Sequence, residues 1–170
     1  MSKEEADKYI IPNEYAVNDY EIIDLIHVGK FGGIYNVKEK STGKTYVMKT
    51  ESFDSRNLAV PVEIRVFKEL RGNYFPKLHE SGNCEKYQLN YAVMNCLGAS
   101  LGQIQLYHNH RLPIEDVYNL GLKMFQAIRV LHFLGYVHRG IKPNNFLLQQ
   151  NPKHPVVLID FNSWKKFRDP

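Results

Sequence analysis

Three features in the first half of the chain have residue types and spacing that could carry chemistry. Residues 29–32 (Gly-Lys-Phe-Gly) lie between two segments of alternating apolar residues. Glycines there either supply positive φ angles to a hairpin or let the backbone approach a phosphate group. Lys49 follows inside a third apolar segment, where a bare ammonium group is unfavourable without a partner, and Glu63 on the next predicted helix is the candidate partner.

The elements that carry these residues are predicted from hydrophobic periodicity and turn residues. Apolar residues alternate on both sides of the glycine-rich turn over residues 20–38, which predicts a hairpin. A third strand is predicted at residues 45–50, because strand-forming side chains follow a turn signal. A short helix with one buried face is predicted at residues 62–70, and two further strands at 77–82 and 88–94. The first half is therefore expected to form five strands and one helix.

The pattern becomes helical in the second half of the chain. Pro113 with two acidic residues behind it marks a helix start. Apolar residues then recur at intervals of three and four over residues 116–134, and Gly135 closes the helix. Two short apolar runs at residues 146–148 and 156–159 predict a small hairpin after it.

Two polar motifs lie directly after these elements and identify a family resemblance. Residues 138–145 (His-Arg-Gly-Ile-Lys-Pro-Asn-Asn) follow the long helix, and residues 158–162 (Leu-Ile-Asp-Phe-Asn) follow the hairpin. With the earlier groups they resemble a protein kinase. Residues 97–101 (Leu-Gly-Ala-Ser-Leu) and 145–148 (Asn-Phe-Leu-Leu) resemble the casein kinase 1 group and its tubulin-kinase and vaccinia-related relatives. The resemblance runs over residues 18–169, with several motifs in family order.

The resemblance implies an α+β, protein-kinase-like fold. A leader at residues 1–17 would precede an N-lobe at 18–97, with a five-stranded antiparallel sheet and one helix. Residues 98–170 would form the first part of the helical C-lobe. Because the sequence ends at Pro170, the large helices of the family's lower lobe are expected to be missing. The 116–134 helix would then expose apolar surface that predicts a protein partner, self-association or low stability.

The resemblance implies ATP and Mg²⁺ as ligands. Gly29 and Gly32 would lie over the phosphates, and Lys49, positioned by Glu63, would hold the α- and β-phosphates. Apolar side chains would sandwich the adenine, with a gatekeeper at Met94 and a backbone segment facing the adenine edge. These adenine contacts are expected from Ile26, Ile34, Val47, Met94, Asn95, Leu97 and Leu147.

The two polar motifs would supply the metal ligands and the contacts to the transferred phosphate. Asn145 and Asp160 would bind the magnesium ions, which prefer oxygen ligands, and Lys142 would meet the transferred phosphate. His138 is predicted to pack beneath Phe161 rather than to act as an acid or base. The family's apolar stack would consist of Phe67, Leu78, His138 and Phe161.

The sequence departs from the family pattern where the reaction needs a carboxylate. Gly140 stands in place of the catalytic Asp, whose proton-accepting role is typically worth about 10²- to 10⁴-fold in rate. Asn144 replaces another position that is often acidic, and Asn162 replaces the glycine of the Asp-Phe-Gly motif. His27 replaces the first phosphate-loop glycine, and its ring either crowds the nucleotide or donates to a phosphate.

These departures predict a nucleotide-binding kinase-like domain with impaired or absent phosphotransfer, a pseudokinase or truncated kinase. Two alternatives remain open: an active serine/threonine kinase in which another group replaces the carboxylate, and a degenerate fragment that binds nothing. The net charge of +4 comes from scattered cations, which argues against nucleic acid as a partner. Cys84 and Cys96 are predicted to be buried thiols in a reducing compartment. With no signal peptide and no apolar run of membrane-spanning length, a cytoplasmic or nuclear protein is expected.

Overall fold

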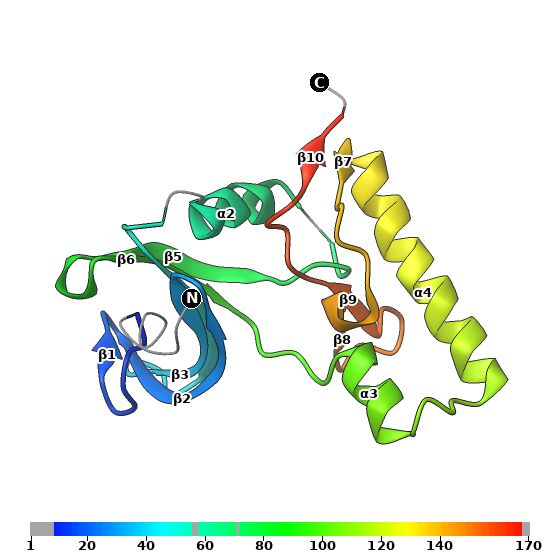
Figure 1. Ribbon diagram of the computed structural model, residues 1–170, viewed down its shortest axis with the longest axis horizontal. Helices are drawn as coiled ribbons and strands as arrows, with labels where there is room; N and C mark the ends of the chain where they lie inside the picture. The colour runs from blue at the N-terminus through cyan, green and yellow to red at the C-terminus, as the bar shows by residue number, and fades with distance from the viewer. Residues whose placement is uncertain (1–8, 56–57, 71, 168–170) are drawn as a thin grey trace. The chain divides into compact units, whose positions relative to one another are not determined.

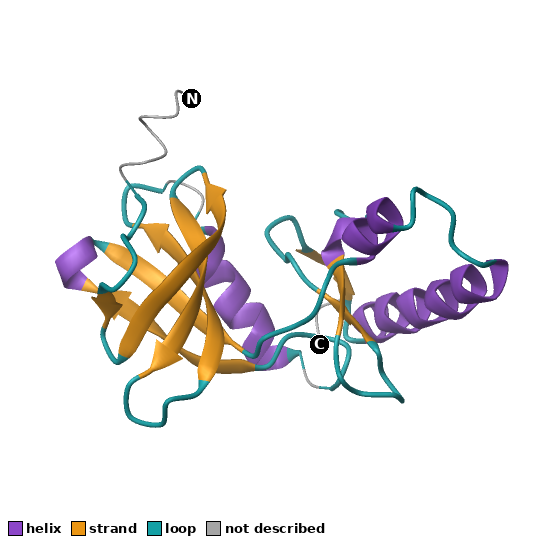
Figure 2. Cartoon of the chain, turned by 90° about the horizontal axis from the view of Figure 1, so that it is seen from below, coloured by secondary structure: helices purple, strands orange, loops and turns teal. Residues whose placement is uncertain are grey.

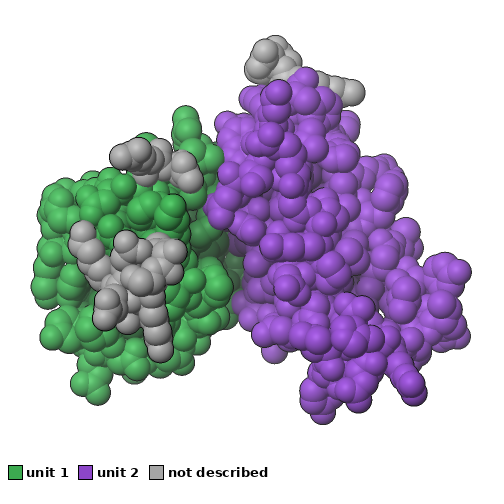
Figure 3. All heavy atoms as spheres, in the orientation of Figure 1, with its two compact units in different colours: residues 1–65, 77–96 green, residues 66–76, 97–170 purple. Residues whose placement is uncertain are grey.

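The chain divides into two compact units. The computed structural model describes residues 9–55, 58–70 and 72–167. The first unit comprises residues 1–65 with 77–96, and the second comprises residues 66–76 with 97–170 (Figure 3). The helix α2 (Ala59–Glu69) contributes residues to both units.

A six-stranded antiparallel sheet forms the first unit, in the order β1-β2-β3-β4-β6-β5 (Figure 1). Its strands are β1 (Ala16–Val17), β2 (Tyr20–Gly29), β3 (Gly32–Glu39), β4 (Thr45–Ser52), β5 (Leu78–Cys84) and β6 (Leu89–Met94), with a 3₁₀ turn η1 (Glu85–Tyr87) between the last two. The predicted α+β fold with an antiparallel sheet is confirmed. The short strand β1 was not predicted, because two residues are too few to show an alternating pattern.

The core of this unit lies on the concave side of the sheet, where every second residue of the paired strands points inward. The fully or nearly buried members are Ile11, Val17, Tyr20, Ile22, Tyr35, Val37, Met48, Cys84, Leu89, Tyr91 and Val93. The sheet curls until its two ends meet, since the Tyr20 hydroxyl donates to Glu80 Oε2 at 2.8 Å and Asn18 Nδ2 donates to the Asn83 carbonyl at 3.2 Å.

The predicted leader contributes to this core. Its residues 1–8 lie outside the described residues, but Ile11 is buried and its backbone N–H donates to the Tyr35 hydroxyl at 3.0 Å. The described part of the expected leader, residues 1–17, therefore packs on the core of the sheet through Ile11. Ile10 and Ile11 before Pro12 give no periodic signal, so the sequence could not reveal this contact.

The helix α2 lies along one face of the sheet (Figure 2). Its buried stripe recurs at helical spacing and consists of Val60, Glu63, Val66 and Phe67, and Leu70 directly after the helix is also buried. The helix begins at Ala59, three residues before the predicted start at residue 62. Pro61 obscured that start, although proline is well tolerated in the first turn of a helix.

The second unit contains two helices and two short antiparallel strand pairs. The helices are α3 (Leu101–Tyr107) and α4 (Ile114–Phe133), and the strand pairs are β7 (Tyr136–Val137) with β10 (Lys165–Lys166) and β8 (Phe146–Leu148) with β9 (Val156–Leu158). The long helix and the β8–β9 hairpin were predicted. Helix α3 was not, although Ser100 and Gln103 form a capping box that marks its start in the sequence.

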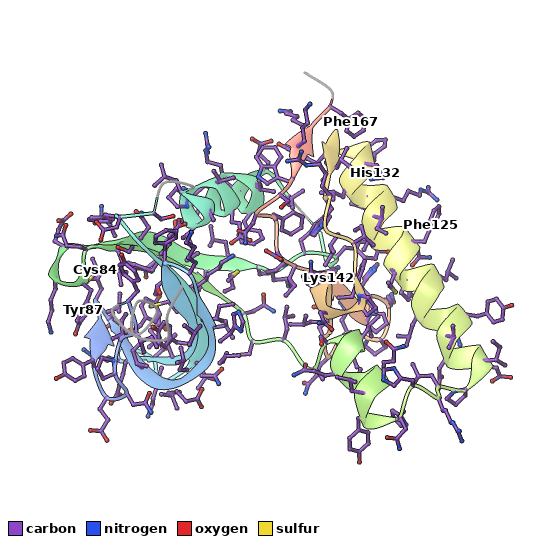
Figure 4. The ribbon with its side chains drawn as sticks, in the orientation of Figure 1. Cys84, Tyr87, Phe125, His132, Lys142 and Phe167 are labelled. Atoms are coloured by element: carbon purple, nitrogen blue, oxygen red, sulfur yellow. The ribbon has the colours of Figure 1, made fainter. Side chains whose placement is uncertain are left out.

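Helix α4 packs against β9 with its buried residues Ala127 and Leu131, and Gly135 ends it with a φ of 86°. Much of its remaining apolar surface is exposed, as Phe125 illustrates in Figure 4. The exposed residues of the helix are Ile114, Val117, Tyr118, Leu122, Phe125 and Phe133. The expected uncovered apolar face is therefore present. No helix in the described part of the chain combines the length and apolar character needed to cross a membrane.

The two cysteines differ in burial. Cys84 belongs to the core of the first unit, as predicted, whereas Cys96 is exposed and the prediction of a buried thiol there was wrong. Cys96 lies beyond Met94, the last residue of β6, where the inward and outward alternation of the strand no longer applies.

Candidate functional site

The candidate ion pair of the first unit is present. Lys49 Nζ lies 2.5 Å from Glu63 Oε2, and the two side chains are 18% and 2% exposed. Lys49 is held in the central strand β4, opposite Ile34 of β3 on one side and Ala92 of β6 on the other. Glu63 lies in the middle of the buried stripe of α2, where an unpaired carboxylate would be strongly destabilising. The sheet and the helix thus fix both partners of the pair.

The glycine-rich turn has close backbone contacts rather than unusual dihedral angles. Among the described glycines only Gly43, Gly72 and Gly135 have positive φ, so the interpretation that residues 29–32 need glycine for positive φ is wrong. A Cβ atom on Gly32 would lie 2.2 Å from the carbonyl oxygen of Thr50. The carbonyl of Phe31, at the tip of the turn, accepts a hydrogen bond from Ser52 N at 2.6 Å. The turn therefore folds against the end of the strand that carries Lys49.

The residues expected to surround the adenine fall into both units. In the first unit, the β4–β6 register places Val47 opposite Met94, and Ile34 is half-buried on β3. Ile26 lies at an irregularity between Leu25 and His27 and is 51% exposed.

The segment after Met94 continues this set. The Asn95 backbone N–H donates to the Lys77 carbonyl at 3.2 Å. In the second unit, Gly98 N donates to the Leu148 carbonyl at 2.7 Å, and Ser100 forms a bridge with Leu147. These bonds place the chain after Leu97 beside β8, so Leu97 and Leu147 belong to neighbouring segments.

The two polar motifs of the second unit are bonded to each other. Asn145 is 5% exposed, and its side-chain amide donates to the Gly140 carbonyl at 2.8 Å and to Asp160 Oδ2 at 3.5 Å. The backbone N–H of Ile159 donates to the Asn145 carbonyl at 2.9 Å. Asp160 has a φ of 69°, and left-handed backbone of this kind concentrates at functional sites. The structure thus brings the two predicted metal ligands together.

Asn145 and Asp160 supply the oxygen donors that Mg²⁺ prefers. Mg²⁺ is commonly held by one or two protein carboxylates, with water and substrate phosphate completing its coordination. Within the described residues no group of three or more His, Cys, Asp or Glu side chains could hold a metal ion. One carboxylate and one amide oxygen are a set that could contribute to a magnesium site completed by water and phosphate.

His138 packs in the core of the second unit, as predicted. It is 1% exposed, its ring centroid lies 5.0 Å from that of Phe161, and Nε2 lies 2.9 Å from the Ile159 carbonyl. Burial holds the pKa of His138 below its ordinary value, which favours the neutral ring. Phe161 also contacts Phe67 at 5.6 Å and Phe75 at 5.9 Å. Phe75 was missed by the sequence analysis, and Leu78 of the expected stack belongs to the first unit.

Position 140 has no side chain, but its surroundings do not demand glycine. The backbone of Gly140 does not have a positive φ. A Cβ atom there would lie 3.4 Å from His138 Nδ1 and 3.7 Å from Asn145 Nδ2, which are ordinary contacts. Lys142, two residues further on, is exposed (Figure 4). The loop therefore has room for a side chain at the position where the family has its carboxylate.

Comparison with known proteins agrees with this arrangement. Residues 20–170 match the family described as the protein kinase domain. The chain is 31% identical over 156 residues to a probable casein kinase I homolog of Encephalitozoon cuniculi, covering 91% of this chain and 51% of the relative. It is 29% identical over 152 residues to a probable serine/threonine-protein kinase of Dictyostelium discoideum, covering 87% of this chain and 30% of the relative.

The chain spans about half the length of the first of these relatives and less of the second. The family match nevertheless extends over both units and includes both polar motifs and the Lys49–Glu63 pair. The chain therefore belongs to the protein kinase domain family and is similar to casein kinase I homologs.

Proposed function

We propose that this kinase domain binds Mg²⁺-ATP and transfers its γ-phosphate slowly or not at all. The observation that carries the proposal is the combination, in one loop, of a buried Asn145 bonded to Asp160 and a Gly140 without a side chain. The groups that suit nucleotide and metal are retained, whereas the group that would accept a proton is missing. Protein hydroxyls are the substrate class that the kinase relatives suggest for any residual transfer.

The phosphate groups would be bound mainly by charge. Lys49 supplies a cation whose position is set by Glu63, 2.5 Å away. Asn145 and Asp160 supply oxygen ligands, and a magnesium ion bound there would neutralise charge on the phosphates. Lys142 is exposed and available to the transferred group.

The proton of an attacking hydroxyl has no carboxylate to accept it at position 140. A positioned general base typically contributes about 10²- to 10⁴-fold to rate, equivalent to roughly 3 to 5.5 kcal/mol of barrier. Gly140 has no side chain, so residue 140 places no proton-accepting group beside His138 and Asn145. Nucleotide binding without efficient transfer is the expected result.

A melting experiment on the 170-residue chain tests nucleotide binding. A ligand that binds only the folded state at 100 times its dissociation constant stabilises it by about 2.7 kcal/mol, or roughly 5 to 10 °C for a domain of this size. Mg²⁺-ATP should produce such a shift in the wild type but not in Lys49→Met. An unchanged melting curve at millimolar nucleotide would leave only the alternative of a degenerate fragment.

The exposed apolar face of α4 supports a second, separate proposal about partners. Six large apolar residues of this helix are between 48% and 83% exposed. Apolar patches of this kind on a folded protein commonly mark a contact surface. We propose that protein covers this face, and sedimentation velocity at increasing concentration will show whether a second copy of the chain can do so.

A further inference from the structure

Among the described residues at the start of α2, none offers a side-chain cap of the kind that a helix normally carries. The residue before the helix, Leu58, has no polar side chain, and its φ is 43°. The first turn contains no acidic residue. The first backbone N–H groups of a helix have no partner within the helix, and buried ones must find an acceptor elsewhere.

Glu51 supplies that acceptor from the neighbouring strand. Its Oε1 accepts from Ala59 N at 3.0 Å, and its Oε2 accepts from Val60 N at 2.9 Å. Pro61 has no N–H, and Val62 N donates to the Leu58 carbonyl at 3.1 Å. Every backbone N–H in the first four positions of α2 therefore has an acceptor, and the Glu51 carboxylate is the acceptor for two of them.

The environment of Glu51 makes these bonds important for the fold. Glu51 is only 6% exposed, and Val60 is fully buried. Ser55 Oγ adds a third donor to Oε1 at 2.6 Å. A negative charge at the N-terminus of a helix is stabilised by the helix dipole, and bonds from N–H to a carboxylate are stronger than neutral ones.

Glu51 and Lys49 lie two residues apart on β4, so their side chains leave the same face of the strand. Lys49 reaches Glu63 of α2, and Glu51 reaches the N–H of Ala59. Residues 59 and 63 are one helical turn apart and share a face of the helix. One strand face therefore holds α2 at two successive turns, once through its backbone and once through the Glu63 carboxylate.

We propose that Glu51 is a positioning residue for the nucleotide site: by capping the first turn of α2, it holds Glu63 against Lys49. The inference depends on the proposed function only where nucleotide affinity is the readout. It predicts that the Lys49–Glu63 pair is formed without ligand and is lost when the cap is removed. In this role Glu51 acts through the backbone of α2.

The first experiment compares Glu51→Ala with Val37→Ala, a core variant in the same sheet that leaves the cap intact. Loss of the cap should lower the melting temperature by roughly 2 to 8 °C, and the core variant serves as the control for lost stability. Measured well below both melting temperatures, Mg²⁺-ATP should bind Glu51→Ala about tenfold more weakly than wild type. Val37→Ala should stay within about twofold of wild type. Equal affinities in the two variants would overturn the positioning role.

A double-mutant cycle tests whether Glu51 acts through Glu63. In a Glu63→Gln background, Glu51→Ala should change nucleotide affinity by less than about twofold, because residues that act through one interaction are not additive. The full tenfold loss in that background would contradict the proposal. Glu51→Gln should lie between wild type and Glu51→Ala, because an amide has one acceptor oxygen where the carboxylate has two.

The reactivity of Lys49 toward an amine reagent gives a readout that needs no nucleotide. Trinitrobenzenesulfonate should modify Lys49 about fivefold faster in Glu51→Ala than in wild type, with Val37→Ala unchanged, because an amine released from its carboxylate partner is more accessible to the reagent. If wild type binds no nucleotide but this difference appears, the proposed function fails and the positioning role stands. If nucleotide binds normally and Lys49 reacts equally in all three proteins, only the positioning role fails.

Discussion

The side-chain amide of Asn145 donates a hydrogen bond to the carbonyl oxygen of Gly140, 2.8 Å away. This bond closes the loop from residue 140 to residue 145, and the same amide joins that loop to Asp160 of the second polar motif, whose Oδ2 lies 3.5 Å away. The loop is therefore ordered around a position that has lost its side chain. A defect in phosphotransfer is expected to come from missing chemistry at residue 140 rather than from a disordered loop.

Gly140→Asp is expected to restore phosphotransfer. A Cβ atom at this position meets His138 Nδ1 at 3.4 Å and Asn145 Nδ2 at 3.7 Å, so the backbone there has room for the first carbon of a side chain. The rate of transfer to a protein hydroxyl should rise about 10²- to 10⁴-fold. Transfer of the γ-phosphate from radiolabelled ATP measures it.

Gly140→Asn is the matched control, since it has nearly the same size and cannot accept a proton as a carboxylate does. It should leave the transfer rate near that of wild type. If Gly140→Asn raised the transfer rate as much as Gly140→Asp, residue 140 would act by filling space. No gain in either variant would contradict the account of this loop.

Gly121→Ala is expected to stabilise the second unit. Gly121 lies in the interior of α4, and a Cβ atom there meets no atom within 4 Å. Alanine is favoured over glycine inside a helix by roughly 0.5 to 1 kcal/mol. The melting temperature should rise by about 1 to 4 °C.

Gly102→Ala is the contrasting variant in α3. Its Cβ atom would lie 1.6 Å from Asn144 Oδ1, so the Asn144 side chain has to move. This variant should gain less than Gly121→Ala or lose stability. Equal gains in both would argue against the packing of α3 on the loop that carries Asn144.

Gly32→Ala is expected to destabilise the first unit. Its Cβ atom would lie 2.2 Å from the Thr50 carbonyl oxygen, so the glycine-rich turn has to lift off the end of β4. Overpacking of this kind typically costs about 1 to 3 kcal/mol. The midpoint of urea unfolding should fall, and it should fall less in Gly29→Ala, whose nearest contact is 3.3 Å.

Glu39 is expected to make stability depend on pH in the acid range. A hydrogen bond from Thr42, and then one from His79, holds the pKa of Glu39 below its ordinary value of 4.5. A carboxylate with a lowered folded-state pKa contributes stability that is complete above pH 4.5 and is lost as pH falls through the folded-state value. Between pH 5 and pH 3, wild type should therefore lose more stability than Glu39→Gln.

Thr42→Val removes the hydrogen bond that contributes most to the lowered pKa of Glu39. The pH dependence of its stability should therefore lie closer to that of Glu39→Gln than the wild-type dependence does. Urea unfolding at each pH measures it, with the exposed Glu21→Gln as the control. A wild type and a Glu39→Gln variant with parallel pH dependence would contradict the assigned role of these bonds.

The fold was largely predictable, because long periodic segments specify element type. The alternation on both sides of residues 29–32 predicted β2 and β3, and the spacing over residues 116–134 predicted α4. The two-residue strands β1, β7 and β10 were not predictable, since two residues define no period. Helix α3 had a usable signal in the Ser100–Gln103 capping box.

The site was predictable in its residue types but not in its supporting contacts. An ammonium group in an apolar strand required a partner, and Glu63 is that partner. The cap from Glu51 depends on how β4 and α2 pack, which the local sequence of the helix does not reveal. Likewise, Gly32 appeared to be a turn glycine, whereas the approach of the Thr50 carbonyl explains it.

The most direct test of the account is equilibrium dialysis of radiolabelled ATP against the 170-residue chain, with and without Mg²⁺. The account predicts one nucleotide bound per chain in the presence of Mg²⁺, with binding greatly weakened in Lys49→Met and in Asp160→Asn. Gly140→Asp should bind as wild type does. Failure of the wild-type chain to retain ATP at millimolar concentration, or retention that is indifferent to both substitutions, would contradict it.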